Sequence, residues 1–547
     1  MDVIKQITNE IEAVDGVRLL DVDPGKATNR TVVTFVGSPD KVCEAAFRAV
    51  KKAGELIDMS KHKGEHPRFG ATDVCPLVPV SGITMEETVE FARKLAERIG
   101  NELGIPVYCY EFTASEPKRK NLASCRSGEY EGLSIKLSNP EWKPDFGPAV
   151  FNDRVAKTGA TAVSARNFLV AYNVNLNTTS TRWANAIAFD IREKGRVKRD
   201  GDPITGKVVT NENGNPVFEP GMLKCVKGVG WFIEEFGIAQ LSFNLTDITI
   251  TSMHQVFEAA CQRADARGIR VTGSELVGMI PLNSILDAGK YFLKKQKRSV
   301  GISDDEIIKI AVKSLGLDEL KPFNPKEKII EYVLEDPTKK LIDFNLKQFS
   351  EETASESAAP GGGSISAYMG ALGAALGIMV ANLSAHKRGW DHLWEEFSNW
   401  AEKGKAYHDQ LIHLVDEDTK AFNTIMEAFG LPKSTDEEKA ARKLAIDAAT
   451  KYAIEIPLKV MQLSYQSMEV MQAMAETGNP NSVTDAGVGA LAACAAVQGA
   501  FLNVKINAKS CSDKAFTSEI LSKGNEIEKA AIELEMKILV VVNEIIK

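Results

Sequence analysis

The chain of 547 residues lacks paired cysteines, an apolar leader and an excess of basic residues. Its eight cysteines are scattered without a C-x-x-C pair, which argues against a disulfide scaffold or a zinc module and favours reduced thiols in the cytoplasm. The opening residues MDVIKQ are polar and helix-like, unlike the apolar core of a signal peptide. The formal net charge of -8 argues against nucleic acid as the main partner.

The composition is that of a globular protein, with 44% hydrophobic and 26% charged residues, and the length allows about three or four domains. Two runs, 365–383 and 486–504, carry no charge and are as long as membrane-spanning helices. Both are rich in alanine and glycine and lie between strongly charged segments. We therefore expect buried central helices of a bundle and no membrane span, with a membrane or scaffold protein as the alternative.

The chain changes character near residue 340. Before it, β-branched strands alternate with helices in two stretches of similar build, 1–168 and 169–334; after a linker over 335–342, residues 343–547 are helical throughout. The pattern predicts two α/β subdomains followed by an all-α bundle, with a projecting hairpin at 200–220. The predicted strands lie at 31–36, 105–112, 168–177, 238–248 and 269–273, and the predicted helices at 40–54, 84–103, 181–194 and 252–267.

The densest polar cluster is the run HKGEHPR, from His62 to Arg68. As text it matches the inverted zinc-protease motif H-x-x-E-H, but that motif needs a helix, which Gly64 and Pro67 oppose. A loop that gathers histidine, glutamate and arginine suits general acid–base chemistry, and Arg68 can hold a carboxylate bidentately. A zinc hydrolase built on His62 and His66, and a plain solvent-exposed loop, are the alternatives.

Two further features of the first half are weaker signals. Asp21 and Asp23 end the run RLLDVDPG, where a strand is expected to turn into a loop. Strand ends often present catalytic carboxylates, but aspartate before Pro-Gly is also a plain turn former. Glycines at 147 and 159 bracket a loop that either wraps a ligand or only connects two elements.

In the helical half, one carboxylate interrupts an apolar stripe. Because a buried unpaired charge is costly, Asp418 should be paired, hydrogen-bonded or facing a cavity, and it is a functional candidate; a satisfied structural aspartate is the alternative. Asp416 and Glu417 fall off the stripe and are expected in solvent. The stripe consists of Leu411, Val415, Asp418, Phe422, Ile425 and Phe429.

The glycines of the run GGGS, among them Gly362 and Gly363, open the first uncharged helix and can expose backbone N–H groups to an anion. The run lacks the GK[ST] of a nucleotide-binding loop, so ATP or GTP is not expected. Asp485 opens the second uncharged helix, either as a cap or as a second polar group of the same cavity as Asp418.

Four segments closely resemble the formiminotransferase-cyclodeaminases, bifunctional folate enzymes of histidine degradation. These segments are LLDVDPGKATNRTVVTFVG, LIDMSKHKGEHPRFGATDVCPLVPV, EWKPDFGP and SAAPGGGS, and the resemblance covers nearly the whole chain in the same domain order. It implies transfer of a formimino group between N-formimino-L-glutamate and tetrahydrofolate. The second domain of the family then closes 5-formiminotetrahydrofolate to 5,10-methenyltetrahydrofolate and releases ammonia.

The resemblance also implies roles for residues. The transferase histidine falls on His66 with Asp23 as the acidic residue near it, and the cyclodeaminase aspartate falls on Asp418. The folate loop falls on 147–159, and both α/β subdomains should carry a ferredoxin-like sheet. The family implies tetrahydrofolate polyglutamate as co-substrate, no metal, and a homo-oligomer. The substrate-binding candidates are Arg68, Gly147, Pro148, Gly159, Gly362, Gly363 and Asp485.

The chain departs from the family pattern at three places. The family usually begins with a strand and a loop resembling ECVPNFSEG, whereas Met1 here starts almost inside the first helix. If that strand is missing, the expectation is a protein with cyclodeaminase activity only. The loop 147–159 is a few residues longer than usual, and the hairpin at 200–220 resembles an insertion.

Overall fold

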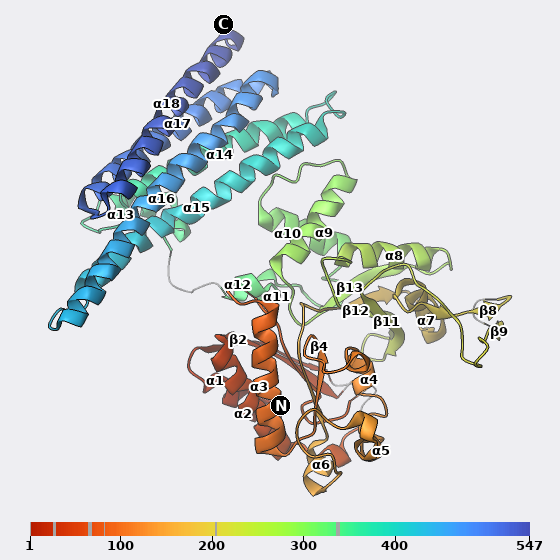
Figure 1. Cartoon of the computed structure of the whole chain (residues 1–547). Helices are drawn as coiled ribbons and strands as arrows, with labels where there is room; N and C mark the ends of the chain where they lie inside the picture. Colours follow the sequence, from red (N-terminus) through yellow and green to blue (C-terminus); the bar gives the residue numbers. More distant parts are fainter. Residues whose placement is uncertain (1, 26–28, 64–67, 81, 203–204, 335–339) are drawn as a thin grey trace. The chain divides into compact units, whose positions relative to one another are not determined.

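The computed structural model describes residues 2–25, 29–63, 68–80, 82–202, 205–334 and 340–547 (Figure 1). The chain forms two compact units, each described separately below. One comprises Met1–Ala288 and Ala311–Glu335, and the other Gly289–Ile310 and Asp336–Lys547. The catalytic histidine expected at position 66 and most of the expected linker, residues 335–339, lie outside the described residues.

The first part of the α/β unit contains a hairpin and a parallel sheet. Strand β1 pairs with β2 antiparallel, and the second sheet has the order β3-β5-β4 with both pairs parallel. Helices α2 and α3 bury one apolar side against this sheet. The elements are α1 Asp2–Glu12, β1 Val17–Gly25, β2 Arg30–Gly37, α2 Pro39–Leu56, β3 Val74–Leu77, α3 Met85–Leu103, β4 Val107–Glu111, α4 Leu122–Cys125, α5 Leu133–Ser138, α6 Asp153–Thr158 and β5 Thr161–Ala165.

The second part of this unit carries a four-stranded antiparallel sheet with the order β11-β12-β6-β13. Helices follow its first and third strands in chain order, and the expected hairpin projects as the pairs β7–β10 and β8–β9 (Figure 1). The elements are β6 Val170–Leu176, α7 Thr181–Ile191, β7 Arg196–Val197, β8 Arg199–Asp200, β9 Lys207–Val208, β10 Phe218–Glu219, β11 Val226–Ile233, β12 Ile238–Leu245, α8 Met253–Asp265, β13 Val271–Val277, α9 Leu282–Lys295, α10 Asp304–Leu315, α11 Pro325–Lys328 and α12 Ile330–Leu334.

Local signals placed several of these elements correctly. Thr84 and Glu87 form a capping box where the helix over 84–103 was predicted to begin, and Gly104 ends that helix in the left-handed conformation. The expectation for the first strand was wrong at its end, because β1 continues through Pro24 and Gly25 instead of turning at the aspartates. A two-stranded sheet tolerates the proline, since each strand has an edge where no N–H is required.

The helical unit is a bundle of long helices, in which α14 packs against α15, α16 and α17 (Figure 1). The two uncharged runs form α14 and α17, which lie antiparallel and close together. A Cβ atom on Gly373 would lie 2.8 Å from the carbonyl oxygen of Gly489, so the small residues permit the close approach that was predicted. The elements are α13 Leu346–Thr353, α14 Gly362–Ala385, α15 Trp394–Gly430, α16 Asp436–Thr477, α17 Val483–Ser510 and α18 Lys514–Ile545.

Two helical segments, Gly362–Ala385 and Pro480–Ser510, are long and apolar enough to cross a membrane, and 56% of each most apolar window is buried inside the protein. The stripe predicted on α15 is correct only in its first half. Leu411 and Val415 are buried, but Phe422 is 45% and Phe429 51% exposed. Beyond Asp418 the buried positions are occupied by alanines, which permit close helix packing.

A segment before the expected linker belongs to the helical unit. Within Gly289–Ile310, the Val300 side chain is fully buried and its backbone N–H donates to Ser398 Oγ at 3.1 Å. The carbonyl oxygen of Gly301 accepts from Asn382 Nδ2 at 2.8 Å. The backbone of this segment is therefore hydrogen-bonded to side chains of α14 and α15.

Candidate active sites

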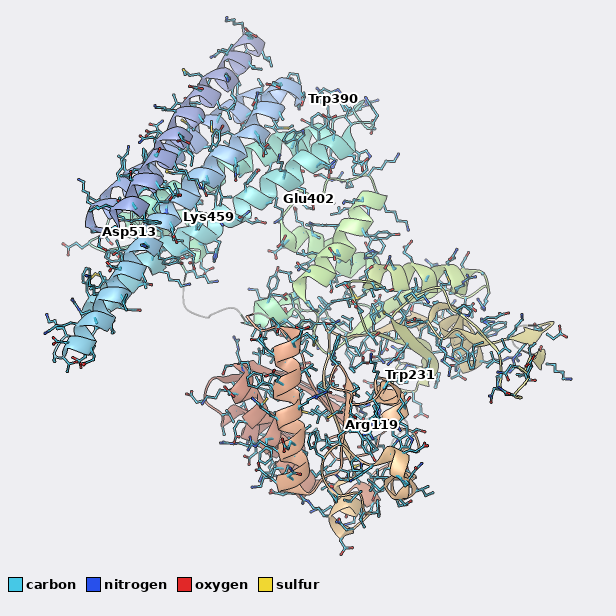
Figure 2. All side chains as sticks on the ribbon, viewed as in Figure 1. Arg119, Trp231, Trp390, Glu402, Lys459 and Asp513 are labelled. Atoms are coloured by element: carbon cyan, nitrogen blue, oxygen red, sulfur yellow. The ribbon has the colours of Figure 1, made fainter. Side chains whose placement is uncertain are left out.

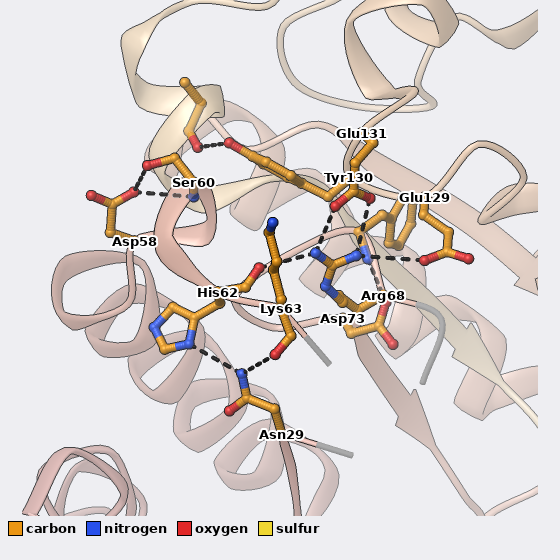
Figure 3. Close-up of polar contacts among 12 residues, drawn as sticks. Asn29, Asp58, Ser60, His62, Lys63, Arg68, Asp73, Glu129, Tyr130 and Glu131 are labelled. Atoms are coloured by element: carbon orange, nitrogen blue, oxygen red, sulfur yellow. Dashed lines mark hydrogen bonds and ion pairs between the residues drawn. The ribbon is translucent and has the colours of Figure 1, made fainter. Parts of the chain in front are cut away.

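The polar run at 62–68 is fixed on both sides of its undescribed centre. Asn29 donates from Nδ2 to the Lys63 carbonyl oxygen at 2.8 Å and lies 3.3 Å from His62 Nδ1 (Figure 3). On the other side, the Arg68 guanidinium bonds to the His62 carbonyl oxygen at 3.0 Å. Asn29 adopts a positive φ of 49°, a conformation that asparagine tolerates better than most residues. His66 itself lies outside the described residues.

Arg68 is bound by carboxylates of the chain itself. Its two terminal nitrogens contact both oxygens of Glu131 at 2.7 and 3.0 Å, and Glu129 lies 3.5 Å away. This hydrogen bonding lowers the pKa of Glu131, so the pair is ionised near neutral pH. In this structure the guanidinium makes its bidentate contact with Glu131, and binding of a substrate carboxylate by Arg68 stays a prediction. The two residues are 63 positions apart, and no local pattern links them.

Asp73 is the centre of a buried network that the sequence did not reveal. Its Oδ2 contacts Arg126 at 2.7 Å and Arg30 at 3.1 Å, while Oδ1 accepts the backbone N–H of Phe69 at 3.1 Å. The Asp73 side chain is only 9% exposed. The network ties β2, the segment after Arg68 and the region of α4 together around the start of β3.

We expect Asp73→Ala to destabilise this subdomain by about 3–5 kcal/mol, because it removes the carboxylate from two partly buried guanidinium groups. Hydrogen exchange of β3 and β5 should show the loss of protection. Asp58→Ala is the matched control. Its carboxylate caps the short 3-10 turn Met59–Lys61 and contacts the nearby Lys61 at 3.0 Å, so its loss should leave β3 and β5 protected. Equal losses of protection in the two variants would contradict the assignment.

The expected folate loop lies at the N-terminal ends of the parallel strands. Gly159 forms an isolated β-bridge with Gly70, just before β5 begins. Gly147 comes directly after Phe146, which forms a second isolated β-bridge with Val107, the first residue of β4. Both glycines have positive φ and touch backbone, so a Cβ would lie 2.1 Å from the Phe69 carbonyl oxygen at 159 and 2.3 Å from that of Ile105 at 147. The segment is not an open loop, because it contains α6. The structure thus brings Gly159 beside the residues that follow Arg68.

A buried ion pair supports the start of this loop. Arg119, labelled in Figure 2, contacts Asp145 at 2.7 Å, and Asp145 also accepts the backbone N–H of Cys109 at 2.8 Å. Gly147 and Pro148 come two and three residues after Asp145 in the chain. Asp145 therefore fixes the chain direction into the loop.

Asp23 lies inside β1, paired with Val32 of β2, and is half-buried. Its neighbour Asp21 lies 3.9 Å from Lys328, and burial is the main cause that raises the pKa of Asp21, with the charge of Asp23 adding to it. The two carboxylates are two residues apart in one strand and therefore point to the same face. The geometry of Asp23 relative to the undescribed residue 66 is not part of the described structure.

In the helical unit, Asp418 caps the start of α14. Its Oδ2 accepts the backbone N–H of Ser364 at 3.0 Å and lies 3.2 Å from the Ser364 hydroxyl. Burial raises the pKa of Asp418, and the two hydrogen bonds from Ser364 oppose that rise. One backbone N–H of the GGGS run thus binds a carboxylate of the chain itself. A hydrogen-bonded Asp418 is what the apolar stripe predicted.

The neighbours of Asp418 are not free in solvent, contrary to the expectation from the stripe. Asp416 accepts the backbone N–H of Leu341 at 2.7 Å. Glu417 accepts a short hydrogen bond from the Tyr452 hydroxyl and contacts Lys420 at 3.1 Å. Each carboxylate has partners far away in the sequence, which periodicity along one helix cannot reveal.

The start of α14, which Asp418 caps, lies beside the C-terminal part of α17. Gly362 lies beside Asn503, since a Cβ on Gly362 would be 3.3 Å from its amide nitrogen. Asp485 lies 18 residues earlier on the same helix as Asn503, about 27 Å away along the axis. Asp485 therefore does not share a cavity with Asp418 in one chain, which excludes that one of the two alternatives, because the helices are antiparallel.

Comparisons with known proteins cover both units. Family models match residues 1–166 (formiminotransferase domain, N-terminal subdomain), 171–335 (formiminotransferase domain) and 345–526 (formiminotransferase-cyclodeaminase). The formimidoyltransferase-cyclodeaminase of Mus musculus is 43% identical over 94% of this chain and 91% of its own length. The chain belongs to the formiminotransferase-cyclodeaminase family.

Other relatives of the formiminotransferase-cyclodeaminase chain correspond to single halves. A glutamate formimidoyltransferase of Thermoplasma acidophilum is 39% identical over 54% of this chain and 88% of its own length. A methenyltetrahydrofolate cyclohydrolase of Methylorubrum extorquens is 39% identical over 32% of this chain and 86% of its own length. Transferase and cyclodeaminase domains are thus both present in one bifunctional chain.

Proposed function

We propose that the α/β unit transfers the formimino group between N-formimino-L-glutamate and tetrahydrofolate, and that the helical unit closes 5-formiminotetrahydrofolate to 5,10-methenyltetrahydrofolate with loss of ammonia. The observation that carries this is the similarity to bifunctional relatives over 94% of the chain. The test is a coupled assay with N-formimino-L-glutamate and tetrahydrofolate that follows the absorbance of the methenyl product. If no methenyl product forms but supplied 5-formiminotetrahydrofolate is converted, the protein has cyclodeaminase activity and lacks transferase activity.

In the transferase we propose His66 as the general acid–base group and Asp23 as the residue that tunes it. Gly147, Pro148 and Gly159 frame the folate, and Arg68 holds the catalytic segment to Glu131. In the cyclodeaminase, Asp418 moves the protons, and Gly362 and Gly363 border the substrate. Tetrahydrofolate polyglutamate is the co-substrate, nearby lysines and arginines bind its tail, and no metal takes part. The four-stranded sheet supports a ferredoxin-like second subdomain, since its order follows a β-α-β-β-α-β connection.

We further propose a cytoplasmic homo-oligomer, with α14 and α17 as buried bundle helices and not as membrane spans. The outer sides of these two neighbouring helices carry large apolar side chains and no charges over 365–383 and 486–504. A second copy of the chain is the partner that such an uncharged face fits. The side chains, between 38% and 66% exposed, are Leu372, Met379, Leu383, Val488, Leu491, Leu502 and Ile506.

Leu491→Glu is expected to dissociate the oligomer, because it places a charge in an apolar interface. The molar mass from light scattering should fall, while the far-UV spectrum should stay that of a helical protein. Leu444→Glu is the matched control, since Leu444 is 71% exposed on α16, outside the proposed face. An unchanged mass for Leu491→Glu would place the interface elsewhere.

A further inference from the structure

The two oxygens of Asp418 have different surroundings. Oδ2 receives the backbone N–H of Ser364, which is fixed in the first turn of α14, and lies near the Ser364 hydroxyl. The same hydroxyl lies 2.8 Å from the carbonyl oxygen of Val415 and has only one proton to share between the two acceptors. Oδ1 has no hydrogen-bond partner among the described residues, and it is not sealed from solvent.

A glycine makes room for this arrangement. A Cβ atom on Gly363 would lie 2.0 Å from Oδ1, 2.4 Å from Cγ and 2.5 Å from Oδ2 of Asp418. The carboxylate therefore lies flat against the Gly363 backbone, in the place that any side chain at 363 would occupy. Gly363 has ordinary helical backbone, so the need for glycine at this position is steric and not conformational.

Among the described residues, no charged group contributes to the shift in the pKa of Asp418. The causes that shift the pKa of Asp418 are its burial and the two Ser364 donors, with no contribution from a charged neighbour. The adjacent Glu417 is engaged by Tyr452 and Lys420. Ser364 is thus the polar group through which the protein acts on Asp418.

The proposed cyclisation needs one proton to move between two nitrogens. The formimino group enters as a protonated amidinium, so its terminal nitrogen already carries two hydrogens. N10 attacks the formimino carbon, a C–N bond forms, and N10 loses its proton. The terminal nitrogen gains this proton as its third hydrogen, its bond to the carbon breaks, ammonia leaves with that electron pair, and the methenyl product keeps the positive charge. The proton lost by N10 equals the proton gained by the leaving nitrogen, so one carboxylate oxygen that accepts and then donates balances the reaction.

We propose that Oδ1 of Asp418 is this single proton-carrying oxygen, and that Ser364 is a positioning residue which anchors Oδ2 so that Oδ1 faces the substrate. Gly363 keeps the place of the carboxylate open. The proposal rests on the proposed catalytic role of Asp418. It adds to that role that the two oxygens act differently: Oδ2 is held in place, and Oδ1 transfers the proton.

The test is the pH dependence of cyclodeaminase kcat/KM in the full chain with supplied 5-formiminotetrahydrofolate. The Ser364 hydroxyl favours the ionised carboxylate, so Ser364→Ala should raise the pKa of Asp418. Because the ionised form starts the reaction, the acid limb should move up by about one pH unit. Transferase activity in the same protein should not change. Ser467→Ala is the control, because this buried serine bonds only to the carbonyl oxygen of Ser464 on its own helix, and its acid limb should not move.

Gly363→Ala supplies a second, independent variant. It should abolish cyclisation with transfer intact, because the added methyl group displaces the carboxylate. Asp418→Asn tests whether Asp418 itself takes part in cyclisation, independently of Ser364 and Gly363. Turnover by Asp418→Asn would reject the proposed function of this residue. An inactive Asp418→Asn together with an unmoved acid limb in Ser364→Ala, or full activity of Gly363→Ala, would overturn the positioning assignment alone.

Discussion

Asp418→Asn is expected to let 5-formiminotetrahydrofolate accumulate while formimino transfer continues. The amide is nearly isosteric and its oxygen can still accept the Ser364 backbone N–H, so the start of α14 should keep its cap. The amide cannot carry a proton between two nitrogens. General acid–base groups contribute about 10²–10⁴-fold, so methenyl formation should fall by that factor.

The measurement is a time course of both folate products after mixing N-formimino-L-glutamate with tetrahydrofolate, followed by chromatography. Asp416→Asn provides the control on the same helix. That carboxylate accepts the Leu341 backbone N–H, which an amide oxygen also can do, and cyclisation should persist. Normal methenyl production by Asp418→Asn would remove this aspartate from the mechanism.

His66→Ala is expected to abolish transfer and to leave cyclisation of supplied 5-formiminotetrahydrofolate unchanged. Histidine titrates near neutral pH and can exchange a proton with both amines as the formimino group moves. The segments on either side are held by Asn29 and by the Arg68–Glu131 pair, so a single alanine should not release the run. The transfer rate should fall by about 10²–10⁴-fold.

His62→Ala is the matched control four residues earlier. His62 contacts Asn29 through Nδ1, and its loss should reduce transfer only slightly. Loss of transfer in both variants together with bound stoichiometric zinc would favour the metal-pair interpretation of H-x-x-E-H instead. Each protein should therefore be analysed for zinc together with the transfer assay.

The parts of this protein that follow from local rules were predictable from the sequence. The capping box at Thr84 and the strand over 31–36 each depend on a few neighbouring residues, and both are found. The hydrogen-bonded state of Asp418 followed from one carboxylate in an apolar stripe.

The parts that failed depend on residues distant in the sequence. Phe422 and Phe429 looked like core residues because they are large and apolar, but Ala421 and Ala428 are buried in their place. Small side chains allow helices to approach closely, and periodicity weighted by hydrophobic size underrates them. Glu131 and Asp73 find their arginine partners across tens of residues, so no spacing rule could have joined them.

The burial of Val300 in the helical unit bears on how this fused protein can be divided. A protease or a gene split that cuts within 335–345 leaves residues 289–310 on a different piece from the helical bundle that they pack with. If the two pieces separate, the Val300 backbone N–H and the Gly301 carbonyl oxygen lose their bonds to the side chains of Ser398 and Asn382. A division of the chain that respects its packing would therefore have to keep residues 289–310 together with the helical bundle.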